Sequence, residues 1–283
     1  MATAAINGVQ MLRVGQRLGP YRIDGVLGTG GMGVVYRAHD RKLRRTVAIK
    51  MVDRADPSKR RALLQEARIA ASLDHPGICS VHGVGCAGDQ PFVVMEHVAG
   101  LPLSAMIPPD RGLAIETVLH YTIQIVGAVA HAHERDVVHC DLKSANVMIT
   151  RCGAVKILDF GLAMRQPLDL DATEGETTRS ETPSGAGTVP YMAPEVLRGR
   201  RADRRSDVWA LGVLMFEMVA GRRPFTGATR YELAAAILSE DPPPLPGRAP
   251  AGLCAIAARC LAKDPDARYA CARSLAAAID DSV

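Results

Sequence analysis

The chain has 283 residues, of which 48% are hydrophobic and 23% are charged. This mixture is typical of a globular protein with a sizeable core, and it excludes a disordered or fibrous chain. The formal net charge of +4 arises from 34 basic and 30 acidic residues, a balance that argues against nucleic acid or an anionic membrane as the main partner.

The cysteine pattern and the apolar stretches indicate the compartment. The seven cysteines form an odd set without a C-x-x-C pair, so we expect reduced thiols and neither a disulfide framework nor a zinc site. The most apolar stretch, residues 208–219, is short and contains Glu217. We therefore expect no membrane-spanning segment in this chain and a cytoplasmic location.

The first part of the chain reads as a small β-rich lobe with one helix, over residues 21–98, after an extension at residues 1–20. The helix is predicted over residues 57–73, where small and apolar residues recur at helical spacing. Short β-type runs bounded by glycines or charged turns predict five strands, at residues 21–26, 34–37, 46–51, 81–84 and 92–95.

The remaining residues, 99–283, read as a larger helical lobe. Five segments combine helical spacing with alanine-rich faces, at residues 115–133, 207–219, 231–239, 253–261 and 273–279. Residues 165–190 show no clear periodicity and are rich in Thr, Ser, Glu and Gly. A loop of that length inside a compact domain is usually functional.

A glycine cluster, Gly28-Thr29-Gly30-Gly31-Met32-Gly33, fits the pattern G-x-G-x-x-G. A dinucleotide-binding fold would need a helix to begin there, but residues 34–36 continue as a strand, and no Gly-Lys-Ser/Thr follows as in a P-loop. The cluster is therefore predicted at the tip of a hairpin, where backbone N–H groups can close over phosphates. Taken alone, it fits an ordinary glycine-rich turn equally well.

Further motifs follow the glycine cluster in a fixed order. Val47-Ala48-Ile49-Lys50 matches a strand that holds a phosphate-binding lysine, and Glu66 is placed on the next helix where it can pair with Lys50. The run His139-Cys140-Asp141-Leu142-Lys143-Ser144-Ala145-Asn146 precedes Asp159-Phe160-Gly161. Phosphoryl transfer needs positioned carboxylates and positive charge, which this set supplies.

This ordered set resembles the catalytic domain of bacterial eukaryotic-type Ser/Thr protein kinases, from Tyr21 to near the C-terminus. The resemblance implies an α+β fold with two lobes, in which a small antiparallel β lobe with one main helix precedes a larger helical lobe. It also implies ATP and Mg²⁺ as cofactors, with Mn²⁺ as an alternative metal, and protein substrates with Ser or Thr acceptors.

The resemblance assigns roles to single residues. Asp141 is expected to accept the proton of the substrate hydroxyl, Lys143 to neutralise the γ-phosphoryl group, and Lys50 with Glu66 to hold the phosphates. Asn146 and Asp159 are expected to bind Mg²⁺, which prefers oxygen ligands. Nucleotide contacts are expected from Leu27, Gly28, Thr29, Gly30, Gly31, Met32, Gly33, Val35, Ala48, Lys50, Met95, Glu96, Val98 and Met148.

Other residues are expected to be structural. By the same resemblance, Asp207 ties the backbone of the catalytic loop to a central helix, Arg268 pairs with Glu195, and His139 supports the loop from within the core. Residues 187–195 resemble the end of the activation segment, which forms the shelf for a peptide substrate. Lys143 and Thr188 together favour Ser/Thr over Tyr as the acceptor.

One residue departs from the family pattern, because Cys140 stands where an arginine is expected. In many kinases that arginine binds a phosphorylated residue of the activation segment and orders it. Cys140 cannot do so, and we hypothesise that basal activity depends less on this switch. Autophosphorylation is expected at Thr173, Thr177, Thr178 and Thr182, and Ser180 and Ser184 are further acceptors.

Two other function classes are consistent with parts of this pattern. A nucleotide-binding scaffold that performs no chemistry, as in a pseudokinase, is disfavoured because all the charged and amide groups named above are present. A small-molecule kinase on a related fold is disfavoured by the long segment that ends in Ala193-Pro194-Glu195.

Overall fold

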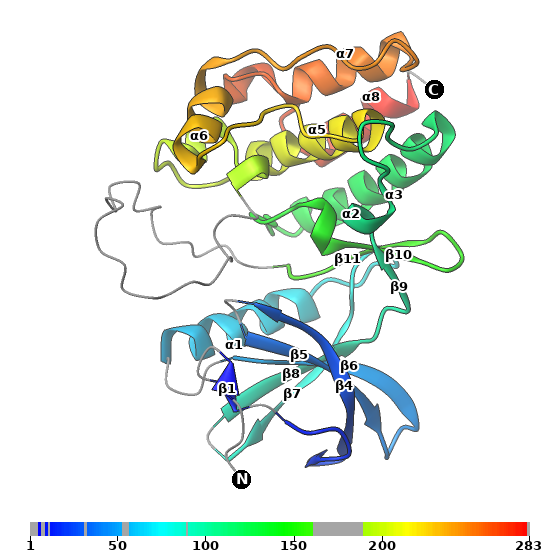
Figure 1. Cartoon of the computed structure of the whole chain (residues 1–283), viewed down its shortest axis with the longest axis vertical. Coiled ribbons are helices and arrows are strands. Elements are labelled where there is room, and N and C mark those ends of the chain that lie inside the picture. The colour runs from blue at the N-terminus through cyan, green and yellow to red at the C-terminus, as the bar shows by residue number, and fades with distance from the viewer. Residues whose placement is uncertain are drawn as a thin grey trace. The chain divides into compact units, whose positions relative to one another are not determined.

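The computed structural model describes residues 5–6, 9–10, 12–30, 33–52, 57–88, 90–160 and 189–281. The chain divides into two compact units, and both are drawn in Figure 1. The first unit contains the described residues up to Asp74 and Cys79–Val98, and the second contains His75–Ile78 and the described residues from Ala99 onward. Within the described ranges, no helix has the length and apolar character needed to cross a membrane.

A six-stranded antiparallel sheet forms most of the first unit, in the order β3-β4-β5-β6-β8-β7. In β5 every second side chain from Val34 to Asp40 is buried, as expected for a strand with one covered face. Ile23 and Ile49 extend this core on neighbouring strands. The strands are β3 (Arg17–Leu18), β4 (Tyr21–Gly30), β5 (Gly33–Asp40), β6 (Arg45–Met51), β7 (Val81–Ala87) and β8 (Gln90–Glu96). Strands β1 (Ala5–Ile6) and β2 (Val9–Gln10) form a separate two-stranded sheet.

Helix α1 (Pro57–Ala71) covers the other face of this sheet. Leu63 and Ala67 pack against Val93, whereas Phe92 and Val94 beside it on β8 belong to the first core. Successive side chains of a strand point to opposite faces, so the two cores lie on opposite sides of the sheet. All five predicted strands and the predicted helix are present, and each strand is longer than its predicted range.

Helices dominate the second unit, around the buried helix α5 (Arg204–Ala220). Its side chains are buried on nearly every side, as expected of a helix with apolar residues all around it. Helices α3, α7 and α8 pack against α5 (Figure 1). The bounds are α2 (Leu103–Met106), α3 (Ile115–His133), α4 (Pro194–Leu197), α6 (Arg230–Ser239), α7 (Ala251–Cys260) and α8 (Ala272–Asp280), so all five predicted helices are present.

A small three-stranded sheet in the second unit was missed by the sequence patterns. Strand β10 (Val147–Thr150) lies between β11 (Val155–Ile157) and β9 (Gly100–Pro102), and both pairings are antiparallel. Strands of three or four residues are too short for alternation to be recognised. This sheet matters for the site because β10 directly follows Asn146, and β11 ends two residues before Asp159.

Candidate active site

In the first unit, Lys50 and Glu66 form an ion pair, with 2.8 Å between Nζ and Oε1. Lys50 lies on β6 and Glu66 on α1, and their side chains are only 6% and 11% exposed. Removing two charges from water costs several kcal/mol, which their attraction offsets only with good geometry. The pairing of Glu66 with Lys50 that the sequence indicated is therefore present. Burying these two charges costs free energy of folding, so the pair is weak evidence of a purely stabilising role.

Residues expected around the nucleotide lie on one face of the sheet in this unit. Lys50 is opposite Val35 on β5, and Ala48 is opposite Met95 on β8. The side chain of Ile49, which lies between Ala48 and Lys50, is in the core on the other face. Because side chains alternate along a strand, all four residues face the side that α1 covers.

The glycine cluster forms the tip of the β4–β5 hairpin, as predicted for residues 28–30 and 33. Gly30 is opposite Gly33 in the hairpin. Gly33 has φ of +117°, and a Cβ added to it would lie 1.9 Å from the carbonyl oxygen of Met51. Glycine at 33 is therefore required by packing. An added Cβ on Gly28 or Gly30 would meet no described atom within 4 Å. The tip is thus open on that side, and Gly31 and Met32 lie outside the described residues.

The segment expected to contact the purine follows β8. The backbone N–H of Glu96 donates to the carbonyl oxygen of Ser80 at 2.8 Å, and the Cys79 thiol contacts the Glu96 carbonyl oxygen at 3.6 Å. Because the N–H group of Glu96 is already used, a purine contact at this residue would have to involve its carbonyl oxygen, which has two lone pairs. Val98 is half-buried at the end of this segment.

In the second unit, two polar side chains of the loop that contains Asp141, those of Lys143 and Asn146, contact this residue. Lys143 Nζ donates to Asp141 Oδ2 at 2.9 Å. Asn146 Nδ2 donates to the Asp141 carbonyl oxygen at 2.9 Å and to Oδ2 at 3.3 Å. Asp141 is only 5% exposed. Its carboxylate therefore has a fixed orientation, and the Asn146 amide presents its oxygen away from Asp141.

His139 connects this loop to Asp159. Its Nδ1 accepts the backbone N–H of Asp141 at 3.2 Å, so its Nε2 carries the proton that is donated to the Leu158 carbonyl oxygen at 3.0 Å. The N–H of Leu158 donates to the Asn146 carbonyl oxygen at 2.8 Å. The His139 side chain is fully buried, in agreement with the structural role expected for it, and it places Asp159 next to the loop.

Asp207 at the start of α5 holds the backbone of the loop. Its carboxylate accepts the N–H groups of His139 at 2.7 Å and Cys140 at 3.0 Å. His133 Nε2 lies 2.9 Å from the same carboxylate, and its Nδ1 accepts the N–H of Ala272 at 3.2 Å. Sequence reasoning missed His133, because its only signal was a position on the buried face of α3.

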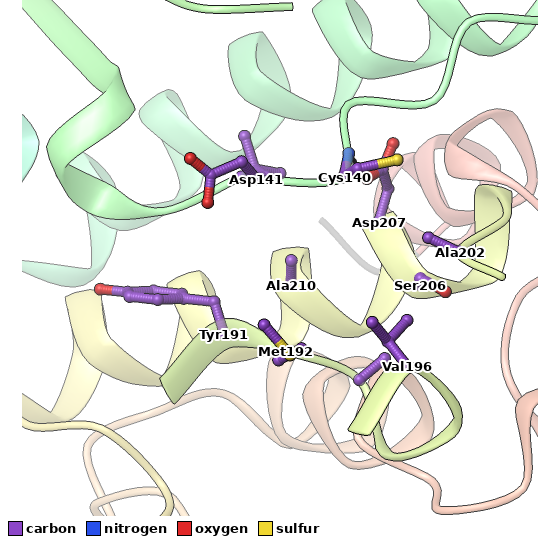
Figure 2. A pocket seen from close by; sticks show the side chains of 11 residues that line it. Cys140, Asp141, Tyr191, Met192, Val196, Ala202, Ser206, Asp207 and Ala210 are labelled. Carbon is purple, nitrogen blue, oxygen red and sulfur yellow. Dashed lines mark hydrogen bonds between the residues drawn. The ribbon is translucent and has the colours of Figure 1, made fainter. Parts of the chain in front are cut away.

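Cys140 lies at the wall of a pocket of about 330 Å³, a volume that includes space open to solvent. Figure 2 shows its sulfur and the Asp141 carboxylate pointing in opposite directions. The other walls are formed by residues 191–193, Val196 and the first turns of α5. The backbone of Cys140 has φ of 62°, a left-handed conformation that costs a non-glycine residue about 1–2 kcal/mol.

Glu195 and Arg268 form a second buried ion pair. Two guanidinium nitrogens of Arg268 donate to the two carboxylate oxygens of Glu195 at 2.9 and 2.8 Å, and Ser206 Oγ donates to Oε1 at 2.9 Å. Burial alone raises the pKa of Glu195, but the donors from Arg268 and Ser206 outweigh it and hold the pKa below its ordinary value. The predicted partner of Glu195 is therefore correct.

Two units thus carry the residues that the sequence singled out. Lys50, Glu66, Val35, Ala48 and the glycines lie in the first unit, and the loop residues, Asp159 and Met148 on β10 lie in the second. Residues 161–188, including Thr188 and the expected phosphoacceptors Thr173, Thr177, Thr178 and Thr182, lie outside the described part of the chain. The fold and these geometries define a protein of the kinase class.

Comparison with known proteins establishes the family. The model of the protein kinase domain matches residues 21–278, so the chain belongs to the protein kinase family. It is 38% identical over 266 residues to a probable serine/threonine-protein kinase of Streptomyces coelicolor, and the match covers 89% of this chain and 38% of that protein.

Two further relatives are also bacterial. The serine/threonine-protein kinase PrkC of Bacillus subtilis is 37% identical over 273 residues, covering 94% of this chain and 41% of PrkC. PknA of Mycobacterium tuberculosis is 38% identical over 266 residues, covering 91% of this chain and 60% of PknA. The chain thus spans about two fifths of the length of PrkC.

Proposed function

We propose that this chain transfers the γ-phosphoryl group of ATP to serine and threonine hydroxyls of proteins. The observation that carries the proposal is the arrangement around Asp141, whose carboxylate is held by both Lys143 and Asn146. A loose phosphoryl-transfer transition state requires positioned groups and positive charge more than covalent chemistry. The names of the relatives as serine/threonine-protein kinases support the choice of acceptor.

Asp141 and Lys143 act on the acceptor and the transferred group. The carboxylate of Asp141 accepts the hydroxyl proton of the substrate and aims the oxygen in line with the phosphorus. Lys143, which donates to Oδ2 at 2.9 Å, brings an ammonium charge next to the position where negative charge accumulates on the phosphoryl oxygens. Both groups therefore act on the bond that forms between the acceptor oxygen and the γ-phosphorus.

Asn146 and Asp159 would hold Mg²⁺, and Mn²⁺ as an alternative. The donor set fits, because a carboxylate and an amide offer the oxygen ligands that these ions prefer. The Asn146 amide nitrogen is directed at Asp141, which leaves its oxygen for a metal. When bound, the ion supplies positive charge to the phosphate oxygens of ATP.

Residues of the first unit bind and orient the nucleotide. Lys50, fixed by Glu66 at 2.8 Å, donates to the phosphates, and the backbone of the open hairpin tip at Gly28 and Gly30 approaches them closely. The face formed by Val35, Ala48 and Met95 contacts adenine, together with Met148 of the second unit. Backbone groups of Glu96 and Val98 bind the purine edge.

The location and the modification of the chain follow from this activity. ATP is a cytoplasmic substrate, so we place the reaction in the cytoplasm. Hydroxyls in the activation segment are candidate acceptors for the chain's own activity, at Thr173, Thr177, Thr178 and Thr182. Mass spectrometry of protein incubated with ATP and Mg²⁺ will identify which of them are phosphorylated.

The test is incubation with labelled ATP, Mg²⁺ and a generic basic protein. Lys50→Met and Asp141→Asn should each lower transfer by at least about 10²-fold, since positioned groups contribute roughly 10²–10⁴. The exposed Lys42→Met and Asp110→Asn are matched controls and should retain the activity of the parent. A parent that binds ATP but transfers no label would indicate a scaffold and overturn the proposal.

A further inference from the structure

A buried hydroxyl group connects the catalytic loop to the segment that follows residue 188. Tyr191 Oη lies 2.9 Å from Ser144 Oγ and donates to Glu217 Oε2 at 2.6 Å. Ser144 and Tyr191 are only 2% and 7% exposed, and the Glu217 side chain 13%. All three residues belong to the second unit, with Tyr191 in the 3-10 turn at Val189–Tyr191 and Glu217 on α5.

The direction of these hydrogen bonds is determined by the number of protons. A phenol has one proton, and Tyr191 gives it to the carboxylate of Glu217. Ser144 must therefore donate its own hydroxyl proton to Tyr191 Oη. Burial, followed by the charge of Glu217, raises the pKa of Tyr191, so the phenol keeps its proton across the physiological range. The three groups form a hydrogen-bonded chain with one polarity.

Ser144 begins the 3-10 turn Ser144–Asn146, which sets the position of Asn146. Within it the Asn146 N–H donates to the Lys143 carbonyl oxygen at 2.9 Å, and the Val147 N–H donates to the Ser144 carbonyl oxygen. The Asn146 side chain in turn contacts the Asp141 carboxylate at 3.3 Å. A rotation of Ser144 would therefore displace both a proposed metal ligand and the proposed base.

We propose that Ser144 is a positioning residue. The hydrogen bond from its hydroxyl to Tyr191 fixes the 3-10 turn Ser144–Asn146, which orients the side chains of Asn146 and Asp141. The inference rests on the proposed function. Ser144 does not itself contact the reacting atoms. Its hydroxyl acts through Tyr191, which Glu217 anchors to the central helix α5. Substrate affinity should therefore depend little on Ser144, whereas the rate of transfer and the magnesium requirement should depend on it strongly.

The experiment compares Ser144→Ala, Tyr191→Phe and the double variant with the parent. Each single variant should lower kcat by about tenfold and raise the Mg²⁺ concentration for half-maximal rate several-fold, since one hydrogen bond is worth up to roughly that factor. KM for the protein substrate should change by less than about twofold. The double variant should be no worse than the poorer single variant, because both break the same hydrogen-bonded chain.

A matched control removes a buried hydroxyl that takes no part in the hydrogen bonds among Ser144, Tyr191 and Glu217. Thr122 on α3 is 2% exposed, and its Oγ1 has no hydrogen-bond partner among the described residues. Thr122→Val should therefore leave kcat and the Mg²⁺ requirement at the parent values. If Ser144→Ala does not fold, the kinetics of Tyr191→Phe test the inference. This variant loses the hydroxyl but keeps the buried aromatic ring, so its packing is preserved.

Two kinetic outcomes would overturn the inference. A kcat within twofold of the parent in both single variants, or losses that multiply in the double variant, would show that the hydroxyls do not position the turn. An inactive parent would instead overturn the proposed function. In that case hydrogen exchange decides about Ser144: exchange at the N–H groups of Asn146 and Val147 should be faster in Ser144→Ala and Tyr191→Phe, and an unchanged rate overturns the inference.

Discussion

The carboxylate of Asp207 accepts the backbone N–H of Cys140 at 3.0 Å, so position 140 is held through its main chain. The same carboxylate accepts the N–H of His139 at 2.7 Å and a bond from His133 at 2.9 Å. The thiol of Cys140 contributes a weak contact of 3.7 Å to the carbonyl oxygen of Val138. The family arginine and this cysteine can therefore share one backbone geometry.

Substitution of Asp207 by asparagine should weaken both stability and transfer. An amide has one acceptor oxygen in place of two, so at least one buried donor loses its partner. The free energy of unfolding should fall by about 2–4 kcal/mol, and kcat should fall with it. Asp136→Asn is the control, because Asp136 is 91% exposed in its pair with Arg204 and should cost less than about 0.5 kcal/mol. Equal urea midpoints for the two variants would contradict the role of Asp207.

Phosphorylation of the activation segment should change the activity of the parent little, since Cys140 carries no charge that could hold a phosphate. Cys140→Arg places a guanidinium at the position where the family has one. Its activity should then become phosphorylation-dependent, rising about tenfold or more when phosphatase-treated protein is allowed to autophosphorylate. Steady-state rates of both forms check this.

The control for that experiment is Cys140→Ala, which removes the thiol and leaves the backbone bonds to Asp207. Its kcat should stay within about threefold of the parent. A large gain of the parent on phosphorylation, abolished by alanine at Thr173, Thr177, Thr178 and Thr182, would refute the idea that Cys140 uncouples activity from this switch.

Arg268 should contribute strongly to stability, because each of its five N–H groups has an acceptor. Besides the two bonds to Glu195, it donates to the carbonyl oxygens of Ala262, Arg205 and Lys263. Arg268→Lys keeps the charge but loses the planar fork, so the free energy of unfolding should fall by about 2–4 kcal/mol. Thermal and urea unfolding measure this.

The matched control is Arg273→Lys, in an exposed pair with Glu134 whose side chains are 76% and 48% exposed. Such a pair contributes roughly 0–1 kcal/mol, so the free energy of unfolding of Arg273→Lys should equal that of the parent within error. A similar loss in both variants would mean that the buried contacts of Arg268 are not what stabilises the unit.

Lys263 should make stability depend on pH in the alkaline range. Its Nζ lies 4.0 Å from the Phe225 ring centroid and donates to the Ile237 carbonyl oxygen at 2.7 Å. Burial lowers the pKa of Lys263 from 10.5 to about 8, although Asp241 and Glu240 oppose the shift. Between these values the folded chain binds fewer protons than the unfolded chain, so the free energy of unfolding should rise with pH.

Urea unfolding at pH 7.5 and pH 9.5 tests this, with Lys263→Met as the control. The substitution removes the titrating group, so the difference in stability between the two pH values should be smaller in the variant than in the parent. An identical difference in both proteins would show that Lys263 keeps its ordinary pKa in the folded chain.

The long elements could be predicted from the sequence because their patterns are local. Residues 115–133 have helical spacing over the whole of α3, and the glycine cluster marks the β4–β5 hairpin. The start of α5 was predicted at Asp207 but is Arg204, after Asp203, whose side chain caps the helix together with Ser206. The three-residue spacing of this capping box is a local signal that the periodicity of apolar residues does not include.

The short elements and the contacts between distant residues could not be predicted. Strand β11 has three residues, too few for alternation to appear. The bond of His133 to Asp207 spans 74 residues, and that of Ser144 to Tyr191 spans 47. Periodicity reports which face of an element is buried and carries no information about which distant side chain meets it. The motif residues were found because their order in the chain is itself the signal.

The left-handed backbone of Cys140 also has a consequence for the order in which the chain folds. Its φ of 62° is unfavourable by itself, and the bond that holds it comes from a carboxylate 67 residues further along. During synthesis, at about 5–20 residues per second, the loop is complete for several seconds before Asp207 exists. We therefore expect the loop to acquire its shape late, when α5 forms. A nascent chain that ends before α5 would contain all the proposed catalytic residues and still lack the geometry proposed for catalysis.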